Sequence, residues 1–416
     1  MATDKTPLLH HGIKTSLPFT GDSALDTTAT STLLHTVFNC LNMLLGTGTL
    51  AVPFAVSSAG WIGLLVIVAV GALSAYTSFC IGAVMSISSA KSFNDVGRVT
   101  FGPAAGRVIA FLVNLELACA LCLYNLIAGE NLHKLYPEKT VSQWVVLTAI
   151  AVLPSAWLPR LSALSYVSAV GIASTMLLFS SIVFAVFEVV STTGTFAVGT
   201  RILGEPQGIS VCIGISLFSF AAHAVLPSLY SQMKKPDDFP KVISISFTLA
   251  CVFYCIVGVL GYGAFGIATQ EQVTINLPKG IVSSVCLLVI VLNPLSKWAL
   301  NLMPIAHTIE EILGLKWEGL YFLLILVERT GLALMVLMVT LKLPFFGVIT
   351  GLTGGVLCSF VSIMIPSLCY MKLYWKELNG WERLLNIVLQ GLGLLVAIQS
   401  AYVGVIDICH KLKEAH

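Results

Sequence analysis

Apolar stretches long enough to cross a membrane recur along the chain and limit its fold more than any other feature. Each is close to the ~20 residues that a helix needs to cross a bilayer. We count eleven, at residues 33–56, 60–86, 107–130, 141–159, 161–187, 207–231, 242–266, 279–306, 319–341, 344–371 and 383–407. Only 10% of the residues are charged, against about 25% in soluble domains. The sequence therefore predicts an all-α polytopic membrane protein with short connections and one membrane domain.

The segments outside these stretches indicate how the chain is oriented. Residues 1–32 are polar and rich in threonine, which predicts a disordered tail. The first apolar run begins too late and is too long for a cleavable signal peptide. Lysine and arginine are more frequent on the side that holds the N-terminus. This bias predicts a cytosolic N-terminus and a lumenal C-terminus, with residues 408–416 as a short final tail.

Motifs for other kinds of chemistry are missing from the sequence. It has no CxxC or HExxH pattern, no phosphate-binding loop and no nucleophile elbow. Ten of its eleven cysteines fall within predicted spans, which argues against a disulfide framework. We expect neither an enzyme nor a nucleotide-driven pump, and no metal, cofactor or nucleic-acid partner.

The first apolar stretch contains residues that weaken a helix at its middle, namely Gly46, Thr47, Gly48, Thr49 and Pro53, and Asn42 is a further candidate substrate-binding residue just before them. Glycine and proline both disfavour a continuous helix. A broken helix at membrane depth is tolerated only where its backbone lines a protein cavity, so the pattern predicts a binding site. The alternative is that the glycines serve close helix packing.

The sixth stretch is interrupted in a corresponding place, at Phe218, Ser219, Phe220, Ala222 and His223. The first and sixth stretches begin two halves of five spans each. Interruptions at matching positions of two halves indicate the substrate site of a transporter.

Several motifs resemble those of one family. The pattern Asn42-x-x-x-Gly46-x-Gly48-x-Leu50-Ala51-x-Pro53 resembles the first-span signature of the amino acid/auxin permease family, in the amino acid-polyamine-organocation superfamily. Residues 218–234 are similar to its sixth-span signature, with Ala222 where the family usually has glycine. Residues 293–306, 329–330 and 343–347 resemble spans eight to ten of its vacuolar amino acid transporter branch. The resemblance covers about residues 33–406.

This resemblance implies a fold and a function. The fold is the LeuT type, with 11 transmembrane helices and two inverted five-helix repeats, at 33–190 and 207–371, in which helices 1 and 6 are broken. Helix 11, at 383–407, is an addition. The implied function is secondary transport of amino acids across a vacuolar or related endomembrane, usually coupled to a proton gradient. The substrate carboxylate is expected at the half-helix after Gly48, where N–H groups are unpaired. Its ammonium is expected at carbonyls of the first half-helix and of residues 218–222.

Charged residues inside spans are functional candidates by default. Lys297 lies one helical turn after Asn293, in the span that borders the coupling sodium in LeuT-type folds. An ammonium there would substitute for the ion and make the carrier sodium-independent. The alternative is a helix-capping or snorkelling lysine near the membrane boundary.

Glu116 and His223 are the other titratable candidates. Glu116 is a candidate proton acceptor in span three, or alternatively a structural partner of Arg329 or Lys297. Arg329 is expected to face the interior. Histidine changes charge near neutral pH, so His223 is a candidate gate or sensor of lumenal acidity. Its alternative role is to cap the broken backbone while neutral.

The N-terminal tail contains Asp4, Leu8 and Leu9 in the form of an acidic dileucine sorting signal. Such signals are bound by sorting adaptor complexes; the alternative is an ordinary solvated tail. Two other functions stay open, an amino acid sensor (transceptor) and a plasma-membrane amino acid or auxin-like permease. A sensor is expected to have a longer tail. A channel is disfavoured because polar positions do not repeat along a span.

Overall fold

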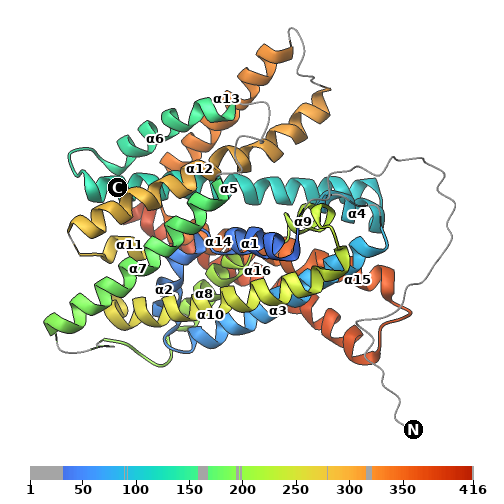
Figure 1. Cartoon of the computed structure of the whole chain (residues 1–416), viewed down its shortest axis with the longest axis horizontal. Helices are drawn as coiled ribbons and strands as arrows, with labels where there is room; N and C mark the ends of the chain where they lie inside the picture. The colour runs from blue at the N-terminus through green and yellow to red at the C-terminus, as the bar shows by residue number, and fades with distance from the viewer. Residues whose placement is uncertain are drawn as a thin grey trace.

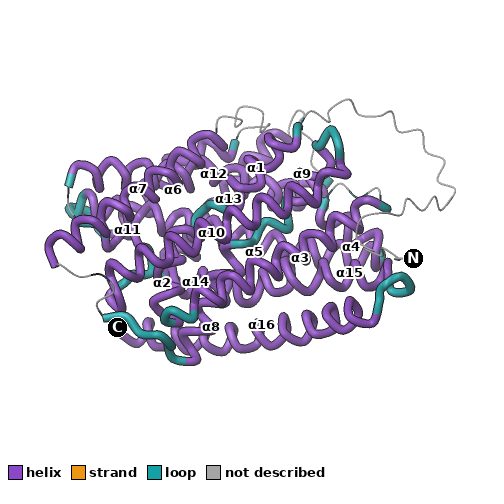
Figure 2. Tube along the Cα trace, turned by 60° about the horizontal axis from the view of Figure 1, so that its bottom comes forward, coloured by secondary structure: helices purple, strands orange, loops and turns teal. Residues whose placement is uncertain are grey.

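The computed structural model describes residues 31–88, 90, 92–157, 167–193, 196, 199–278, 280–314 and 321–414. Within these ranges the chain is helical, and many of its long helices run along the longest axis of the molecule (Figure 1). Figure 2 shows α16 side by side with α8 along one face. The α-helices are α1 (Leu33–Leu44), α2 (Gly48–Ala59), α3 (Gly63–Ser86), α4 (Phe93–Phe101), α5 (Pro103–Leu135), α6 (Val141–Ala156), α7 (Val167–Thr193), α8 (Pro206–Ser219), α9 (Leu226–Gln232), α10 (Phe239–Phe265), α11 (Val273–Asn276), α12 (Ile281–Leu313), α13 (Tyr321–Lys342), α14 (Phe346–Leu352), α15 (Ile365–Tyr374) and α16 (Gly380–Glu414).

Two 3-10 helices and one π-helix connect some of these α-helices. Two 3-10 turns, η2 (Pro236–Asp238) and η3 (Gly266–Ala268), flank α10. A π-helix, η4 (Thr353–Met364), joins α14 to α15. Because π-helices usually occur as single turns at functional sites, a π-helix of 12 residues is unusual.

The predicted polytopic membrane architecture is confirmed. Among the described helices, seven are long and apolar enough to cross a membrane, or eight if α1 and α2 count as one bent span. Three shorter apolar helices, Val141–Ala156, Thr175–Ser191 and Pro206–Ser219, overlap other predicted spans. The count of eleven spans and the boundaries of the two repeats stay predictions.

Local sequence signals set several helix boundaries. Ser92 and Asp95 form a capping box at the start of α4, as Thr140 and Gln143 do at the start of α6. These reciprocal bonds satisfy backbone N–H groups that would otherwise be unpaired. Gly60 follows α2 with a φ of 77°, a left-handed conformation that favours glycine.

The broken spans lie inside the bundle rather than on its surface. Helix α2 packs on α8, and α10 contacts α1, α2 and α3. Small residues bring α8 close to the α14–η4 segment, since a Cβ added to Gly214 would lie 2.5 Å from the Gly351 carbonyl oxygen. Close backbone approach of this kind is how helices pack without bulky side chains in membranes.

Candidate functional site

The first span breaks between α1 and α2. Helix α1 ends at Leu44, α2 begins at Gly48, and the two helices are bent by 54°. Within the break, the Leu45 N–H donates to the Leu41 carbonyl (2.7 Å) and the Gly46 N–H to the Leu44 carbonyl (2.7 Å). Gly46 and Thr47 therefore lie in the break, while Gly48 and Thr49 begin α2.

The second break lies between α8, which ends at Ser219, and α9, which begins at Leu226. Local turns hold it, with the Ala221 N–H donating to the Phe218 carbonyl (3.2 Å) and the Ala222 N–H to the Phe220 carbonyl (3.0 Å). The sequence offered these two carbonyls as acceptors for a substrate ammonium. The Phe218 carbonyl also accepts from the Phe220 N–H, which uses both of its lone pairs, whereas the Phe220 carbonyl retains a second acceptor position.

The two breaks touch each other. A Cβ added to Gly48 would lie 2.7 Å from Ser219 Cα, closer than carbon atoms pack. A Cβ added to Gly46 would lie 3.5 Å from the Met43 carbonyl oxygen and 4.0 Å from Lys297 Nζ, which are ordinary contacts. Close packing therefore explains the glycine at 48 and leaves the glycine at 46 unexplained.

Three side chains from three other helices bind the carbonyls at the end of α1. Lys297 Nζ of α12 donates to the Asn42 carbonyl (3.4 Å), and Thr175 Oγ1 of α7 donates to the Leu45 carbonyl (2.9 Å). The Tyr254 hydroxyl of α10 bonds to the Leu44 carbonyl and lies 3.0 Å from the Ser219 carbonyl. Tyr254 therefore bridges the two breaks.

Lys297 and Asn293 approach the first break from α12. Lys297 is 8% exposed, so it does not snorkel to the surface. Beside the break is a cavity of about 20 Å³ whose lining includes Gly46, Thr47, Thr175 and Asn293. A cavity of this size holds about one water molecule. The arrangement thus combines a buried cation with room for one small species.

His223 faces α3 and not the backbone of its own break. Its Nε2 lies 2.9 Å from Thr77 Oγ1, 3.1 Å from Ser78 Oγ and 3.1 Å from the Ser74 carbonyl oxygen. The ring is 1% exposed. The alternative in which His223 caps the backbone of its own break is therefore wrong. The histidine binds residues of α3 instead and so joins the second break to that helix.

Glu116 of α5 approaches η4, with Cys358 Sγ donating to its Oε1 at 3.6 Å. Its Oε2 is buried and has no hydrogen-bond partner among the described residues. The alternative in which it pairs with Arg329 or Lys297 is wrong, since neither ion pair occurs in the described part of the chain. A buried carboxylate oxygen without a donor is costly, which keeps Glu116 a candidate for proton uptake.

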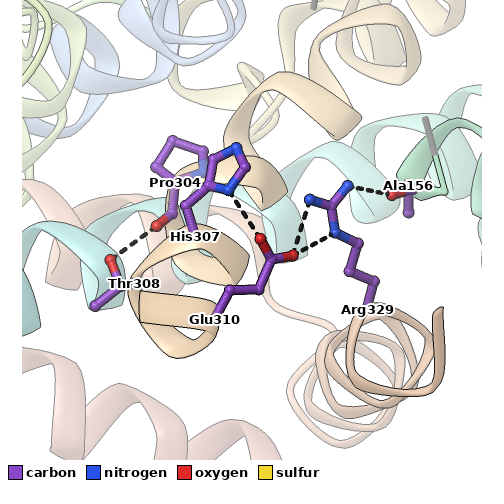
Figure 3. Close-up of polar contacts among 6 residues, drawn as sticks. All are labelled: Ala156, Pro304, His307, Thr308, Glu310 and Arg329. Atoms are coloured by element: carbon purple, nitrogen blue, oxygen red, sulfur yellow. Dashed lines mark hydrogen bonds and ion pairs between the residues drawn. The ribbon is translucent and has the colours of Figure 1, made fainter. Parts of the chain in front are cut away.

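Arg329 belongs to a different cluster, which includes Ala156, His307 and Glu310 (Figure 3). It is fully buried, and Glu310 Oε1 lies 3.0 Å from its Nε and 2.9 Å from its Nη2. Its Nη1 donates to the Ala156 carbonyl (3.0 Å), and His307 Nδ1 lies 3.0 Å from Glu310 Oε2. The cluster connects α6, α12 and α13 through buried hydrogen bonds and an ion pair, which indicates a structural role.

Polar side chains also hold the connection between α10 and α12 at the end of the bundle where α2 ends. The side chains come from α2, from α5 and from the connection itself, whose Glu271 accepts from the Gly347 backbone N–H at the start of α14. The bonds are Ser57 Oγ to the Gly266 carbonyl (3.1 Å), Asn131 Nδ2 to Gln272 Oε1 (2.9 Å), Gln272 Nε2 to Glu130 Oε2 (2.7 Å), Lys134 Nζ to the carbonyls of Thr274 (2.7 Å), Ile275 (2.9 Å) and Leu277 (2.6 Å), and the Gly347 N–H to Glu271 Oε2 (2.6 Å). This connection, residues 266–277, therefore closes over that end.

Tyr254 and Thr175 are the site residues that sequence reasoning missed. Both lie in long apolar helices with no break or charge nearby in the sequence. No sequence signal distinguishes either side chain from the other polar residues of these helices. The predicted sorting residues Asp4, Leu8 and Leu9 lie outside the described residues.

Comparison with known proteins identifies the family. Residues 29–406 match the family model described as "Transmembrane amino acid transporter protein". The chain belongs to this family. It is 31% identical to the amino acid transporter AVT1B of Arabidopsis thaliana, over 90% of this chain and 71% of that protein. Identity to AVT1H of the same plant is 31%, over 89% of each chain.

Solved structures confirm the predicted transporter fold. The chain resembles the crystal structure of MhsT in complex with L-phenylalanine, with a TM-score of 0.61 and 14% identity. The match covers 89% of this chain and 97% of that one. The LeuT-type fold is therefore established for this member of the family.

Proposed function

We propose that this protein is a secondary carrier that moves amino acids across a membrane by alternating access, with the substrate held where the two breaks meet. The observation that carries the proposal is the contact of Gly48 with Ser219, bridged by Tyr254. It brings irregular backbone from two distant spans to one place inside the bundle. Irregular backbone at membrane depth is typical of transporter binding sites.

The polarity of the two breaks supports a zwitterionic substrate. The N-terminus of α2 favours an anion, and we assign the substrate carboxylate to it. Carbonyl oxygens at the end of α1 and in residues 218–222 favour a cation, and we assign the ammonium to their remaining lone pairs. The family and its AVT1 relatives support amino acids as the substrate class.

Uptake into proteoliposomes tests this function. Purified protein is reconstituted, and radiolabelled amino acids are presented with an imposed pH gradient, a sodium gradient or neither. We expect saturable uptake of at least one amino acid above the level of protein-free vesicles. Uptake that is absent for every proteinogenic amino acid under all three conditions would contradict a carrier and favour the sensor.

We propose further that protons drive the carrier and that the Lys297 ammonium occupies the place of a coupling sodium ion. Its burial, its bond to the Asn42 carbonyl and the adjacent small cavity support this. We expect uptake to persist without sodium and to be lost in Lys297→Met, while the exposed control Lys241→Met transports normally. A wild-type protein that requires sodium and ignores the pH gradient would exclude the substitution.

We also propose a vacuolar or lysosome-like membrane as the location, with the N-terminus in the cytosol and the C-terminus in the lumen. The acidic dileucine form of Asp4, Leu8 and Leu9 supports recognition by a sorting adaptor complex. Replacing Leu8 and Leu9 by alanine is expected to move the protein to the cell surface. Unchanged localisation of that variant would remove the sorting signal from the proposal.

A further inference from the structure

The carbonyls that end α1 are already bound, whereas the N–H groups that begin α2 are not. Side chains of three other helices bond to the carbonyls of residues 42, 44 and 45. The N–H groups of Thr47 and Gly48 bind no acceptor within the described residues. The start of a helix carries a partial positive charge, so two unpaired N–H groups there form a preferred place for an anion.

The Lys297 ammonium adds a full positive charge and further donors at the same break. An ammonium has three N–H groups, and the described residues give this one a single acceptor, the Asn42 carbonyl at 3.4 Å. Lys297 is 8% exposed, and no carboxylate in the described part of the chain forms an ion pair with it. A buried charge without an opposite charge is costly, and an anion bound beside it would remove that cost.

Gly46 leaves the space that an anion needs beside this ammonium. A Cβ added at Gly46 would lie 4.0 Å from Lys297 Nζ, so a side chain there would occupy the space in front of the charge. Gly46 and Thr47 also line the cavity of about 20 Å³ at the first break, together with Asn293. A cavity of this size admits one group about as large as a water molecule. Close packing does not explain the glycine at position 46, whereas a bound anion does.

We propose that the first break is an anion site. In this site Lys297 supplies the charge, the N–H groups of Thr47 and Gly48 supply directed hydrogen bonds, and Gly46 supplies the space. The ligand is a small monovalent anion, which is either the carboxylate of the substrate or a chloride ion. The carboxylate case rests on the proposed carrier function, and the chloride case does not.

Lys297 then has two roles at once. One N–H binds the Asn42 carbonyl, as a coupling sodium ion would, and the other two are directed at the anion. A helix N-terminus alone carries about half a unit charge, whereas hydrogen bonds from an ammonium to an anion are about twice as strong as those between neutral groups. The site is therefore expected to distinguish a carboxylate from the amide of the same size, because the amide has no negative charge.

Thermal unfolding of the purified full-length protein tests the site without transport, because a ligand that binds only the folded protein raises Tm. The probes are sodium chloride, sodium propionate and uncharged propionamide, at equal ionic strength, with the bulkier methanesulfonate as the reference anion. We expect chloride, propionate or both to raise Tm by at least about 2 °C over methanesulfonate, and propionamide to leave it unchanged. A shift with propionate alone identifies a carboxylate site, and a shift with chloride alone identifies an ion site. Shifts with both identify one shared site, at which the two anions compete.

Two variants with matched controls locate the binding. Lys297→Met removes the charge and is expected to lose the anion-dependent shift, while the exposed control Lys241→Met keeps it. Gly46→Ala fills the space in front of the ammonium and is also expected to lose the shift. It meets only ordinary contacts, so it tests the site even where Lys297→Met fails to fold. Its control is Gly391→Ala on α16, where an added Cβ meets no described atom within 4 Å.

Absence of a shift with either anion in the wild type overturns the proposal. A shift of wild-type size in Lys297→Met or in Gly46→Ala also overturns it, because the anion would then bind elsewhere. Failure of the carrier function is a separate result, seen as absent amino acid uptake in proteoliposomes while the anion-dependent shift persists.

Discussion

Gly48 and Gly46 belong to one motif, yet the structure predicts that an added methyl group destabilises the protein at Gly48 and not at Gly46. In Gly48→Ala the new Cβ would lie 2.7 Å from Ser219 Cα, whereas carbon atoms pack at about 3.5–4.0 Å. The two backbones must separate by roughly 0.8 Å to relieve this contact. Overpacking of this kind costs about 1–3 kcal/mol, and the better helix propensity of alanine offsets up to about 1 kcal/mol.

We therefore expect Gly48→Ala to lose about 1–2 kcal/mol of stability and most of its transport, because the contact between the breaks is pushed apart. Gly46→Ala meets only ordinary contacts and is expected to fold as the wild type does. The assay is SDS-induced unfolding of the purified variants, followed by amino acid uptake in proteoliposomes. Equal losses in the two variants would refute the packing argument and favour direct substrate contact at both glycines.

Three further outcomes follow from buried polar contacts. Tyr254→Phe removes a donor shared by both breaks and is expected to lower the free energy of unfolding in SDS by about 1–3 kcal/mol. The exposed control Tyr402→Phe is expected to leave that free energy unchanged, and equal losses in the two variants would argue against the bridge. Glu310→Gln leaves the charge of Arg329 buried without its partner and is expected to cost about 3–5 kcal/mol, and the double variant with methionine at both positions is expected to regain stability. If Glu116 takes up the transported proton, Glu116→Gln transports with a flattened pH profile, and an unchanged profile in uptake measurements would exclude that role.

The breaks were predictable from the sequence because their causes are local. Glycine inside an apolar run disfavours a helix, and the structure breaks the chain at residues 45–47 and 220–225. Pro53, which was expected to weaken the first span, lies instead inside α2. Lys297 was conspicuous for a similar reason, since a cation in an apolar helix needs a partner.

The partners across the bundle were not predictable, because they depend on how distant helices rotate against each other. A tyrosine in an apolar span gives no indication of which face it occupies, so the Tyr254 bridge had no distinguishing signal. Arg329 was expected to face inward, yet its partner proved to be Glu310, from a position near the end of another span. The π-helix of residues 353–364 likewise depends on packing against α8 and α16.

The connection at residues 266–277 has a kinetic consequence. Its bonds come from α2, α5 and α14, so a carrier that opens at this end must release it from spans of both halves of the chain. Each hydrogen bond stabilises the closed state by about 0.5–1.5 kcal/mol. Bonds that must break before the transition state for opening raise its activation free energy, and every increase of about 1.4 kcal/mol slows opening about tenfold. Residues that do not contact the substrate, such as Lys134, thereby limit the rate of turnover.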